Sequence, residues 1–395
     1  MIEHYRTSFN TLFTKKKYTT FTHNLEKGFV KIPFRVAETP VFIPKALEKQ
    51  LIAAGAELIA LIKQPDFKAL TDNAIPPDWN VANKNDHPHF LCFDFGICKD
   101  DQGNLVPRLI EMQGFPSLYG FQAHLAETYK TSFNLPHHLS PYFNGLNEPQ
   151  YIDLLRSVIV GKHQPHEVAL MDIAAPEQKT LIDFLITKQF LGIKILSITD
   201  IFKEGQNLFY QENEKKVQLK RIYNRLIFDE IADQTALFKD HFDPREALNI
   251  EWITHPNWFY RISKYTMPFL KSEFVPETHF LNTLARIPTD LENYVLKPLF
   301  SFAGIGVIID VTLADINNIK DPQNWILQRK VVYEPVVQAP DGGIKVEIRL
   351  MYLWPDGQEP KLCINLTRLS RGKMIGVRYN KDFDWVGGTI GLMEH

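Results

Sequence analysis

The chain has 395 residues, of which 45% are hydrophobic and 23% are charged, so it is long enough for two or three domains with buried cores. Its 44 Lys and Arg residues nearly balance its 46 Asp and Glu residues, and the formal net charge is −2. This balance argues against nucleic acid or an anionic membrane surface as a partner.

The compartment is indicated by the N-terminal segment and the cysteines. The first ten residues lack the apolar core of a signal peptide, and nowhere does the chain contain the run of about eighteen apolar residues that a membrane helix needs. The three cysteines are Cys92, Cys98 and Cys363, an odd number without CxxC spacing. We therefore expect a cytoplasmic protein without a zinc site. The role of residues 1–90 is left open.

The first long periodic segment covers residues 43–62. Apolar residues recur there at helical spacing, at Leu47, Leu51, Ala54, Leu58 and Leu61. Gly55 is the one weak position in this pattern. The segment predicts an amphipathic helix that faces a core.

Two β-like runs follow at residues 90–97 and 106–113, joined by a polar turn, and they predict a hairpin. Alternation places Glu111 and Gln113 on one face of the second strand, and the hairpin partner brings Asp94 alongside. Three oxygen ligands of this kind suit Mg²⁺ in a nucleotide site. The alternative is a half-buried strand whose polar face meets water.

The middle of the chain has a different pattern. A strand at residues 167–173, a helix at 177–191 and a strand at 193–197 follow one another, with Gly192 at the turn, and another apolar run covers residues 217–227. Strand, helix and strand in this order predict a parallel, Rossmann-like α/β unit.

A helical stretch over residues 258–270 leads to residues 294–310, which predict a strand, a small-residue loop and a second strand. Lys297 lies at the end of the first strand, and Ser301, Gly304 and Gly306 form a loop whose backbone can approach an anion. We interpret this loop as a flap over phosphates; the alternative is a turn that needs positive φ. Neither a Walker loop nor a dinucleotide fingerprint fits.

Further candidate ligand contacts lie on both sides of this flap. Lys264 is a second cation for phosphate, or else an ordinary surface lysine. After it come β-like runs at residues 325–332, 345–353 and 361–367. In the first of these, backbone groups of residues 328–331, including Gln328, Lys330 and Val331, are candidates to contact adenine, and Glu334 to accept from ribose. An exposed edge strand with solvated charges is the alternative.

Arginines complete the set of candidates, because their planar guanidinium groups match carboxylate and phosphate oxygens in pairs. The residues concerned are Arg221, Arg225, Arg349, Arg368, Arg371 and Arg378. No motif for a serine, cysteine or zinc-activated nucleophile is present.

In this order the motifs resemble the circularly permuted branch of the ATP-grasp superfamily, which includes the synthetase domain of glutathionylspermidine synthases. Residues 93–95 and 109–117, which resemble metal-binding strands, precede the lysine segments 261–264 and 295–307. The resemblance implies an α/β (α+β) ATP-grasp fold, circularly permuted, with an inserted Rossmann-like pre-ATP-grasp domain. We expect a metal-binding half at residues 1–150, the Rossmann-like domain at 151–255 and the nucleotide-binding half at 256–395.

The resemblance also implies a role for each candidate residue. Lys264 and Lys297 would hold ATP phosphates under the flap at residues 301–306. Residues 328–331 would contact adenine, and Asp94, Glu111 and Gln113 would bind Mg²⁺. Arg378 would lie near the reacting group, with Arg349 as a second catalytic candidate. Two departures stand out, because the family pattern has Arg where this chain has Cys92 and Asn where it has Gln113.

We therefore expect an ATP- and Mg²⁺-dependent ligase that joins a carboxylate to an amine through an acyl phosphate. Its substrates would be small molecules or peptides, which the sequence does not identify. The two departures motivate an alternative, a catalytically reduced module that binds a nucleotide or peptide. Phosphoryl transfer to an acceptor other than a carboxylate is a third hypothesis.

Overall fold

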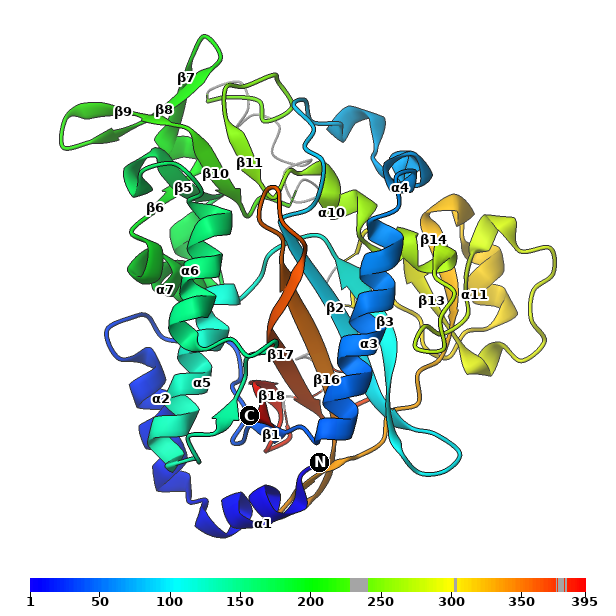
Figure 1. The fold of residues 1–395 in the computed structure, drawn as a ribbon. Coiled ribbons are helices and arrows are strands. Elements are labelled where there is room, and N and C mark those ends of the chain that lie inside the picture. The colour runs from blue at the N-terminus through cyan, green and yellow to red at the C-terminus, as the bar shows by residue number, and fades with distance from the viewer. Residues whose placement is uncertain (228–240, 302–303, 374, 376–379, 381) are drawn as a thin grey trace.

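Figure 1 shows the computed structural model of the chain, which describes residues 1–227, 241–301, 304–373, 375, 380 and 382–395. The architecture is mixed α/β, with helices around several separate sheets. Within the described residues, no helix is long and apolar enough to cross a membrane.

The largest sheet has six strands and combines the two ends of the sequence. Its main path runs β18-β17-β16-β2-β3, and β15 pairs with β16. The strands are β2 (Phe90–Lys99), β3 (Leu105–Gln113), β15 (Val337–Ala339), β16 (Gly342–Leu353), β17 (Lys361–Ser370) and β18 (Gly387–Thr389). The predicted hairpin of residues 90–113 is confirmed as the antiparallel pair β2–β3.

One face of this sheet is covered by α3 (Lys45–Ile62), which confirms the helix predicted at residues 43–62 (Figure 1). A Cβ atom at Gly55 would lie 2.1 Å from Tyr352 Oη and 3.1 Å from Leu350 Cδ1. The weak position in the helix therefore lets α3 approach β16 closely. Because side chains alternate along a strand, the neighbouring residue Arg349 projects from the opposite face.

Other helices and a small sheet complete the body of the molecule. The helices are α1 (Glu3–Leu12), α2 (Lys15–Glu26), α4 (Phe67–Leu70), α5 (Tyr119–Phe133) and α6 (Glu148–Ile159). Strands β1 (Val41–Phe42), β19 (Gly391–Glu394) and β4 (Leu139–Ser140) form the small sheet in that order, next to both ends of the chain.

The parallel α/β unit predicted in the middle of the chain is confirmed. Its sheet has the order β11-β10-β5-β6, and all neighbouring pairs are parallel. The elements are β5 (Val168–Asp172), α7 (Leu181–Leu191), β6 (Lys194–Ser197), β10 (Arg221–Asn224) and β11 (Glu251–Ile253). Gly192 ends α7 with a φ of 75°. All four strands lie within the predicted domain of residues 151–255.

The prediction of one continuous run over residues 217–227 is wrong. The segment divides into β9 (Lys215–Leu219) and β10, which belong to different sheets. Strand β9 joins β7 (Ile201–Glu204) and β8 (Asn207–Glu212) in an antiparallel sheet that projects from the body (Figure 1). Lys220 separates the two strands, and the chain changes direction there without a glycine or proline to mark the change.

The remaining sheet has the order β12-β14-β13 and lies on the side of the molecule where Figure 1 labels α11. Its elements are β12 (Thr278–Phe280), β13 (Tyr294–Pro298), α11 (Leu313–Asn318) and β14 (Trp325–Arg329). Strand β14 is central and pairs with both neighbours, so the exposed edge strand considered as an alternative is not found. We call this sheet the lid sheet.

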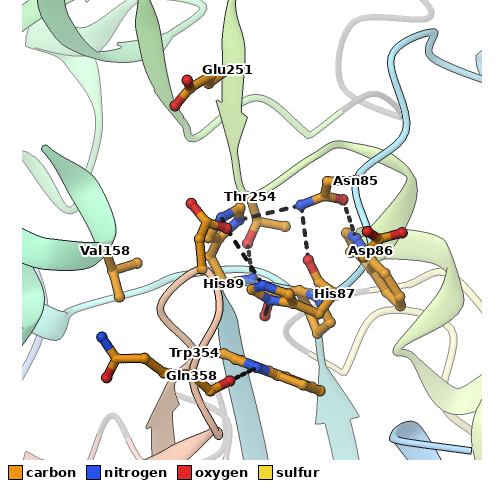
Figure 2. A network of polar contacts seen from close by, with 12 residues as sticks. Asn85, Asp86, His87, His89, Val158, Glu251, Thr254, Trp354 and Gln358 are labelled. Atoms are coloured by element: carbon orange, nitrogen blue, oxygen red, sulfur yellow. Dashed lines mark hydrogen bonds and ion pairs between the residues drawn. The ribbon is translucent and has the colours of Figure 1, made fainter. Parts of the chain in front are cut away.

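A polar junction connects the turn between β16 and β17 to the parallel sheet (Figure 2). In that turn, Asp356 accepts a hydrogen bond from His89 Nε2 at 3.1 Å and lies 3.4 Å from both His87 Nε2 and Arg221 Nη2. Arg221 at the start of β10 also donates to Glu251 in β11 at 2.6 Å. The hydrogen bonds from His87 and His89 hold the pKa of Asp356 well below its usual range. The junction therefore joins the two largest sheets through charge.

Near this junction, His255 is 1% exposed, and its Nε2 lies 2.8 Å from the backbone oxygen of Ala82. Burial lowers the pKa of His255 to about 4, against an opposing effect of the Ala82 hydrogen bond. In the unfolded chain this histidine is protonated below about pH 6.5, whereas in the folded protein it is protonated only below about pH 4. The contribution of His255 to stability is therefore fully present above about pH 6.5 and decreases as the pH falls from there to about pH 4.

We expect acidification from about pH 7 to about pH 4 to cost up to about 3 kcal/mol of unfolding free energy through His255 alone. Urea unfolding of the wild type and of His255→Gln at the two pH values measures this contribution. The variant should lose less stability on acidification than the wild type. Equal losses in the two proteins would contradict the assignment to His255.

Candidate functional site

The face of the six-stranded sheet opposite α3 carries charged side chains from several strands. Asp94 in β2 lies directly opposite Glu111 in β3 and Arg349 in β16. Gln113 lies opposite Cys92, on the same face. Directly opposed residues have neighbouring side chains. The structure therefore brings Asp94, Glu111 and Gln113 together on one face, as alternation in the sequence predicted.

Both oxygens of Asp94 are engaged by arginines. Arg349 Nε donates to Oδ1 at 2.5 Å and its Nη2 donates to Oδ2 at 2.7 Å, while Arg368 Nη2 donates to Oδ2 at 2.5 Å. Burial favours the neutral carboxyl, but the two guanidinium groups outweigh it and hold the pKa of Asp94 below its usual value. Asp94 is therefore a charged, buried partner of Arg349 and Arg368.

Glu111 and Gln113 have different surroundings. Gln113 Nε2 donates to Glu111 Oε1 at 2.6 Å, and Glu111 Oε2 lies 4.0 Å from Lys264 Nζ. A carboxylate and an amide are ligand types that suit Mg²⁺, which often takes one or two carboxylates together with phosphate oxygens. Asp94 does not fit in this way, because arginines occupy its oxygens. Among the described residues, no group of three His, Cys, Asp or Glu side chains is placed to hold a metal ion.

Lys297 reaches from the lid sheet to the six-stranded sheet. Its Nζ donates to the backbone oxygen of Ile110 at 2.9 Å and to Gln328 Oε1 at 2.6 Å. Burial lowers the pKa of Lys297 to about 8, with Glu111 opposing this effect and Lys264 adding to it. The ammonium group thus stays mostly protonated at neutral pH, in a position where burial makes an added negative charge favourable.

Lys264 is buried and begins the short 3₁₀ helix η7 (Lys264–Phe269), which follows α10 (Asn257–Arg261). Its Nζ donates to the backbone oxygen of Ser301 at 2.5 Å. Burial lowers its pKa, and Glu111 acts in the opposite direction. The alternative of an exposed surface lysine is therefore wrong. Lys264 and Lys297 come from different elements and share Glu111 as their nearby carboxylate.

The predicted flap begins at Ser301 and is described from Gly304 onward; residues 302–303 lie outside the described part. Gly304 and Gly306 have φ values of 71° and 74°, which glycine adopts without strain. The second strand of the predicted hairpin is reduced to one bridge, in which Ile308 and Leu296 exchange backbone hydrogen bonds at 2.9 Å. A cavity of about 620 Å³ lies between residues 73–77, residues 298–301 and residues 321–325.

The segment after β14 crosses the six-stranded sheet. A Cβ atom at Gly96 would lie 2.8 Å from Tyr333 Cε1 and 3.0 Å from Val331 Cγ1, so glycine permits the crossing. The backbone N–H of Glu334 donates to the oxygen of Ile97 at 3.2 Å. Val331 and Glu334 thus lie over the sheet.

Gln328 and Lys330, two further residues predicted to contact nucleotide, are held by other groups. Gln328 directs its buried side chain to Lys297 and donates to Thr278 Oγ1 at 3.1 Å. Lys330 Nζ lies 3.3 Å from Asp310 Oδ1. Gln328 therefore positions the ammonium group of Lys297, which the sequence did not indicate.

The arginines of the sequence do not form a single cluster. Arg349 and Arg368 meet at Asp94, whereas Arg221 belongs to the junction at Asp356, and Arg371 pairs with Asp341. Arg378 lies outside the described residues. Among the described residues, Arg349 and Arg368 are thus the two candidate arginines that meet on one carboxylate.

Arg225, just after β10, is buried with its guanidinium carbon 5.0 Å from the ring centre of Phe115 and 5.3 Å from that of Phe184. In the described part of the chain, its Nε and Nη1 have no hydrogen-bond partner. Arg225 also acts electrostatically on the buried carboxylate of Asp183. A buried cation between aromatic rings with unpaired donors is suited to an anion. The sequence alone could not predict this arrangement, since Phe115 and Phe184 come from distant elements.

The structure adds Glu347 and Tyr333 to the charged face. Glu347 in β16 lies opposite Arg368 in β17 and forms an ion pair with it. Tyr333 Oη donates to Glu347 Oε2 at 3.2 Å. Burial raises the pKa of Glu347, with Arg368 opposing this and Asp94 adding to it. Asn365 in β17 donates to the backbone oxygens of Pro141 and Gly391.

Comparison with known proteins places the fold. No family model matches the chain, and no curated protein matches its sequence. Among solved structures it is similar to the apo form of a glutathione synthetase-like effector from Globodera pallida, with a TM-score of 0.58, 12% identity and coverage of 96% of both chains. At this identity the likeness concerns the fold alone. The chain thus has a glutathione synthetase-like fold.

Proposed function

We propose that the chain is an ATP-dependent ligase that joins a carboxylate to an amine. The observation that carries this proposal is the meeting of Lys264 and Lys297 beside Glu111. Two buried ammonium groups from separate elements, next to a glycine-containing loop, form a site for a polyanion between the lid sheet and the six-stranded sheet. The fold is compatible with ligase chemistry.

In the proposed reaction, a carboxylate oxygen of the acid attacks the γ-phosphorus of ATP, and the bond from that phosphorus to the β,γ-bridging oxygen breaks. The products are an acyl phosphate and ADP. The amine then attacks the acyl carbon, phosphate leaves, and the amine loses a proton as the amide forms. Lys264 and Lys297 would hold the phosphates and reduce their charge during transfer. The loop from Ser301 to Gly306 would exclude water from the acyl phosphate.

The remaining assignments belong to the same proposal. Val331 and its neighbours would contact adenine, and Glu334 would contact ribose. Mg²⁺ would be held by Glu111 and Gln113 together with phosphate oxygens, and it would supply further charge neutralisation. Arg349 and Arg378 are the proposed catalytic arginines. The circular permutation and a cytoplasmic location are likewise proposals.

Arg225 is our candidate for binding the acid substrate. Its guanidinium donors lie beside Phe115, which follows Gln113 by two residues at the end of the metal-binding strand. A second carboxylate or phosphate group of the substrate would occupy these donors. This position favours acids with two anionic groups, one at Arg225 and one that reacts at the lysines.

Release of ADP tests the proposal. The full chain is incubated with ATP and MgCl₂ and with pools of amino acids, polyamines and small peptides, and ADP is measured by a coupled assay. We expect ADP formation that requires both an acid and an amine, with an amide product of matching mass in the active pool. ADP formation at the same rate with and without the added substrates would contradict the proposed ligase activity. So would a phosphorylated product without an amide.

A second candidate function is a binding module with reduced catalysis. The observation in its favour is the pair of arginines on Asp94, together with Cys92 at a position where the resembled family has a cation. Such a module binds ATP without turnover in any substrate pool. The same assay, run beside calorimetric ATP titration, separates the two functions.

A further inference from the structure

The unusual feature of the site is the saturation of a predicted metal ligand by guanidinium groups. A carboxylate offers roughly four lone pairs, and the arginine hydrogen bonds to Asp94 use three of them. Asp94 is 1% exposed, so water does not compete for these bonds. A divalent ion on Asp94 would lie next to both guanidinium groups, and the repulsion is weakly screened at a buried site.

The two arginines on Asp94 differ in their exposure and in their other partners. Arg349 is 5% exposed and gives two hydrogen bonds to Asp94. Arg368 pairs with both Asp94 and Glu347 through Nη2, and a third of its side chain is exposed. Its Nε has no hydrogen-bond partner among the described residues. Arg368 is thus held by two carboxylates through Nη2, while its side chain as a whole stays partly exposed.

The surrounding charges leave the site cationic. Lys264, Lys297, Arg349 and Arg368 face Asp94, Glu111 and Glu347, which is one positive charge in excess. Glu111 acts electrostatically on all four cations. A bound anion is therefore attracted without first recruiting a metal ion.

We propose that Asp94 is a positioning residue for Arg349 and Arg368, and that Arg368, Lys264 and Lys297 bind a polyphosphate group without a divalent ion on Asp94. The proposal rests on the nucleotide site proposed above, but it does not depend on ligase turnover. The polyphosphate would thus bind without Mg²⁺, whereas phosphoryl transfer would need Mg²⁺ at Glu111.

Calorimetric titration with inorganic tripolyphosphate tests this directly. The full chain is titrated once in EDTA and once in excess MgCl₂. We expect the affinity in EDTA to equal or exceed that in MgCl₂, because magnesium removes negative charge from the ligand. Affinity that falls by about tenfold or more in EDTA, a difference of about 1.4 kcal/mol, would overturn the proposal, as would no binding in either buffer.

Two charge variants locate the binding. Arg368→Gln should weaken tripolyphosphate binding in EDTA by about tenfold or more, because it removes a charge-assisted donor. Lys216→Gln is the matched control, since it removes one cation from the projecting β9 and its pairing with Glu204. The control should bind as the wild type does. Equal affinities for Arg368→Gln and Lys216→Gln would overturn the role of Arg368.

Mn²⁺ binding, followed by electron paramagnetic resonance, tests Asp94 itself. We expect Asp94→Asn to bind Mn²⁺ as the wild type does and Glu111→Gln to bind it more weakly; weaker binding by Asp94→Asn would overturn the proposal. If Asp94→Asn fails to fold, the wild-type titration still decides. Tripolyphosphate binding in EDTA without ADP formation would refute the ligase and support this inference. Ligase activity together with tripolyphosphate binding that requires magnesium would support the ligase and overturn this inference.

Discussion

Replacement of Lys297 by methionine should lower ATP turnover by about a hundredfold or more, because loss of one preorganised donor to a developing charge costs this much in other enzymes. Methionine preserves the length of the side chain. The substitution removes a charge whose pKa burial has already lowered to about 8, so the loss of two hydrogen bonds is partly offset by relief of desolvation. We therefore expect an effect on ATP that far exceeds the effect on folding.

Three measurements on Lys297→Met separate these effects: calorimetric ATP titration, ADP release and urea unfolding. Lys216→Met serves as a matched control, because Lys216 lies on the projecting sheet and pairs with Glu204. The control should match the wild type in all three. If Lys297→Met kept the ATP affinity and turnover of the wild type, the proposed role of Lys297 in binding ATP phosphates would be wrong.

The second large effect concerns stability. Arg349→Met should lower the unfolding free energy by about 3–5 kcal/mol, because it leaves a buried carboxylate with one of its two cations. Combining it with Asp94→Leu should recover most of this loss, since the buried charge is then removed together with its partner. Arg368 then pairs with Glu347 alone.

Urea unfolding of the two single variants and the double variant gives the coupling between Asp94 and Arg349. A coupling of several kcal/mol is expected at this burial. Additive losses, in which the double variant is as unstable as the two single variants together, would show that the pair is energetically independent. Lys216→Met again controls for removal of a cation at the surface.

The hairpin that carries Asp94 and Glu111 could be predicted because its determinants are local. Alternating strands and a polar turn with Gly103 specify the register of β2 and β3. The prediction of a second strand after the flap fails, since Gly304 and Gly306 take positive φ values and Ile308 makes a single bridge. Such a bridge depends on packing that sequence periodicity does not encode.

The partners of Asp94 could not be predicted for a different reason. Arg349 and Arg368 lie 255 and 274 residues away in the sequence. The sequence contains Asp94 and both arginines, but it does not show that the pairing of distant strands brings their side chains together. Strand alternation and the resemblance predict Asp94 as a metal ligand, whereas its ion pairs come from the order β17-β16-β2.

The same strand order has a consequence for how the chain acquires its structure. Strands β2 and β3 are synthesised long before β16, yet β2 needs β16 to cover its second edge. The parallel sheet lies between them in sequence and is built from nearby segments. During translation we expect this middle unit to form first, while β2 presents an unpaired edge until the C-terminal strands emerge. Nascent chains truncated before β16 are accordingly the form most prone to self-association.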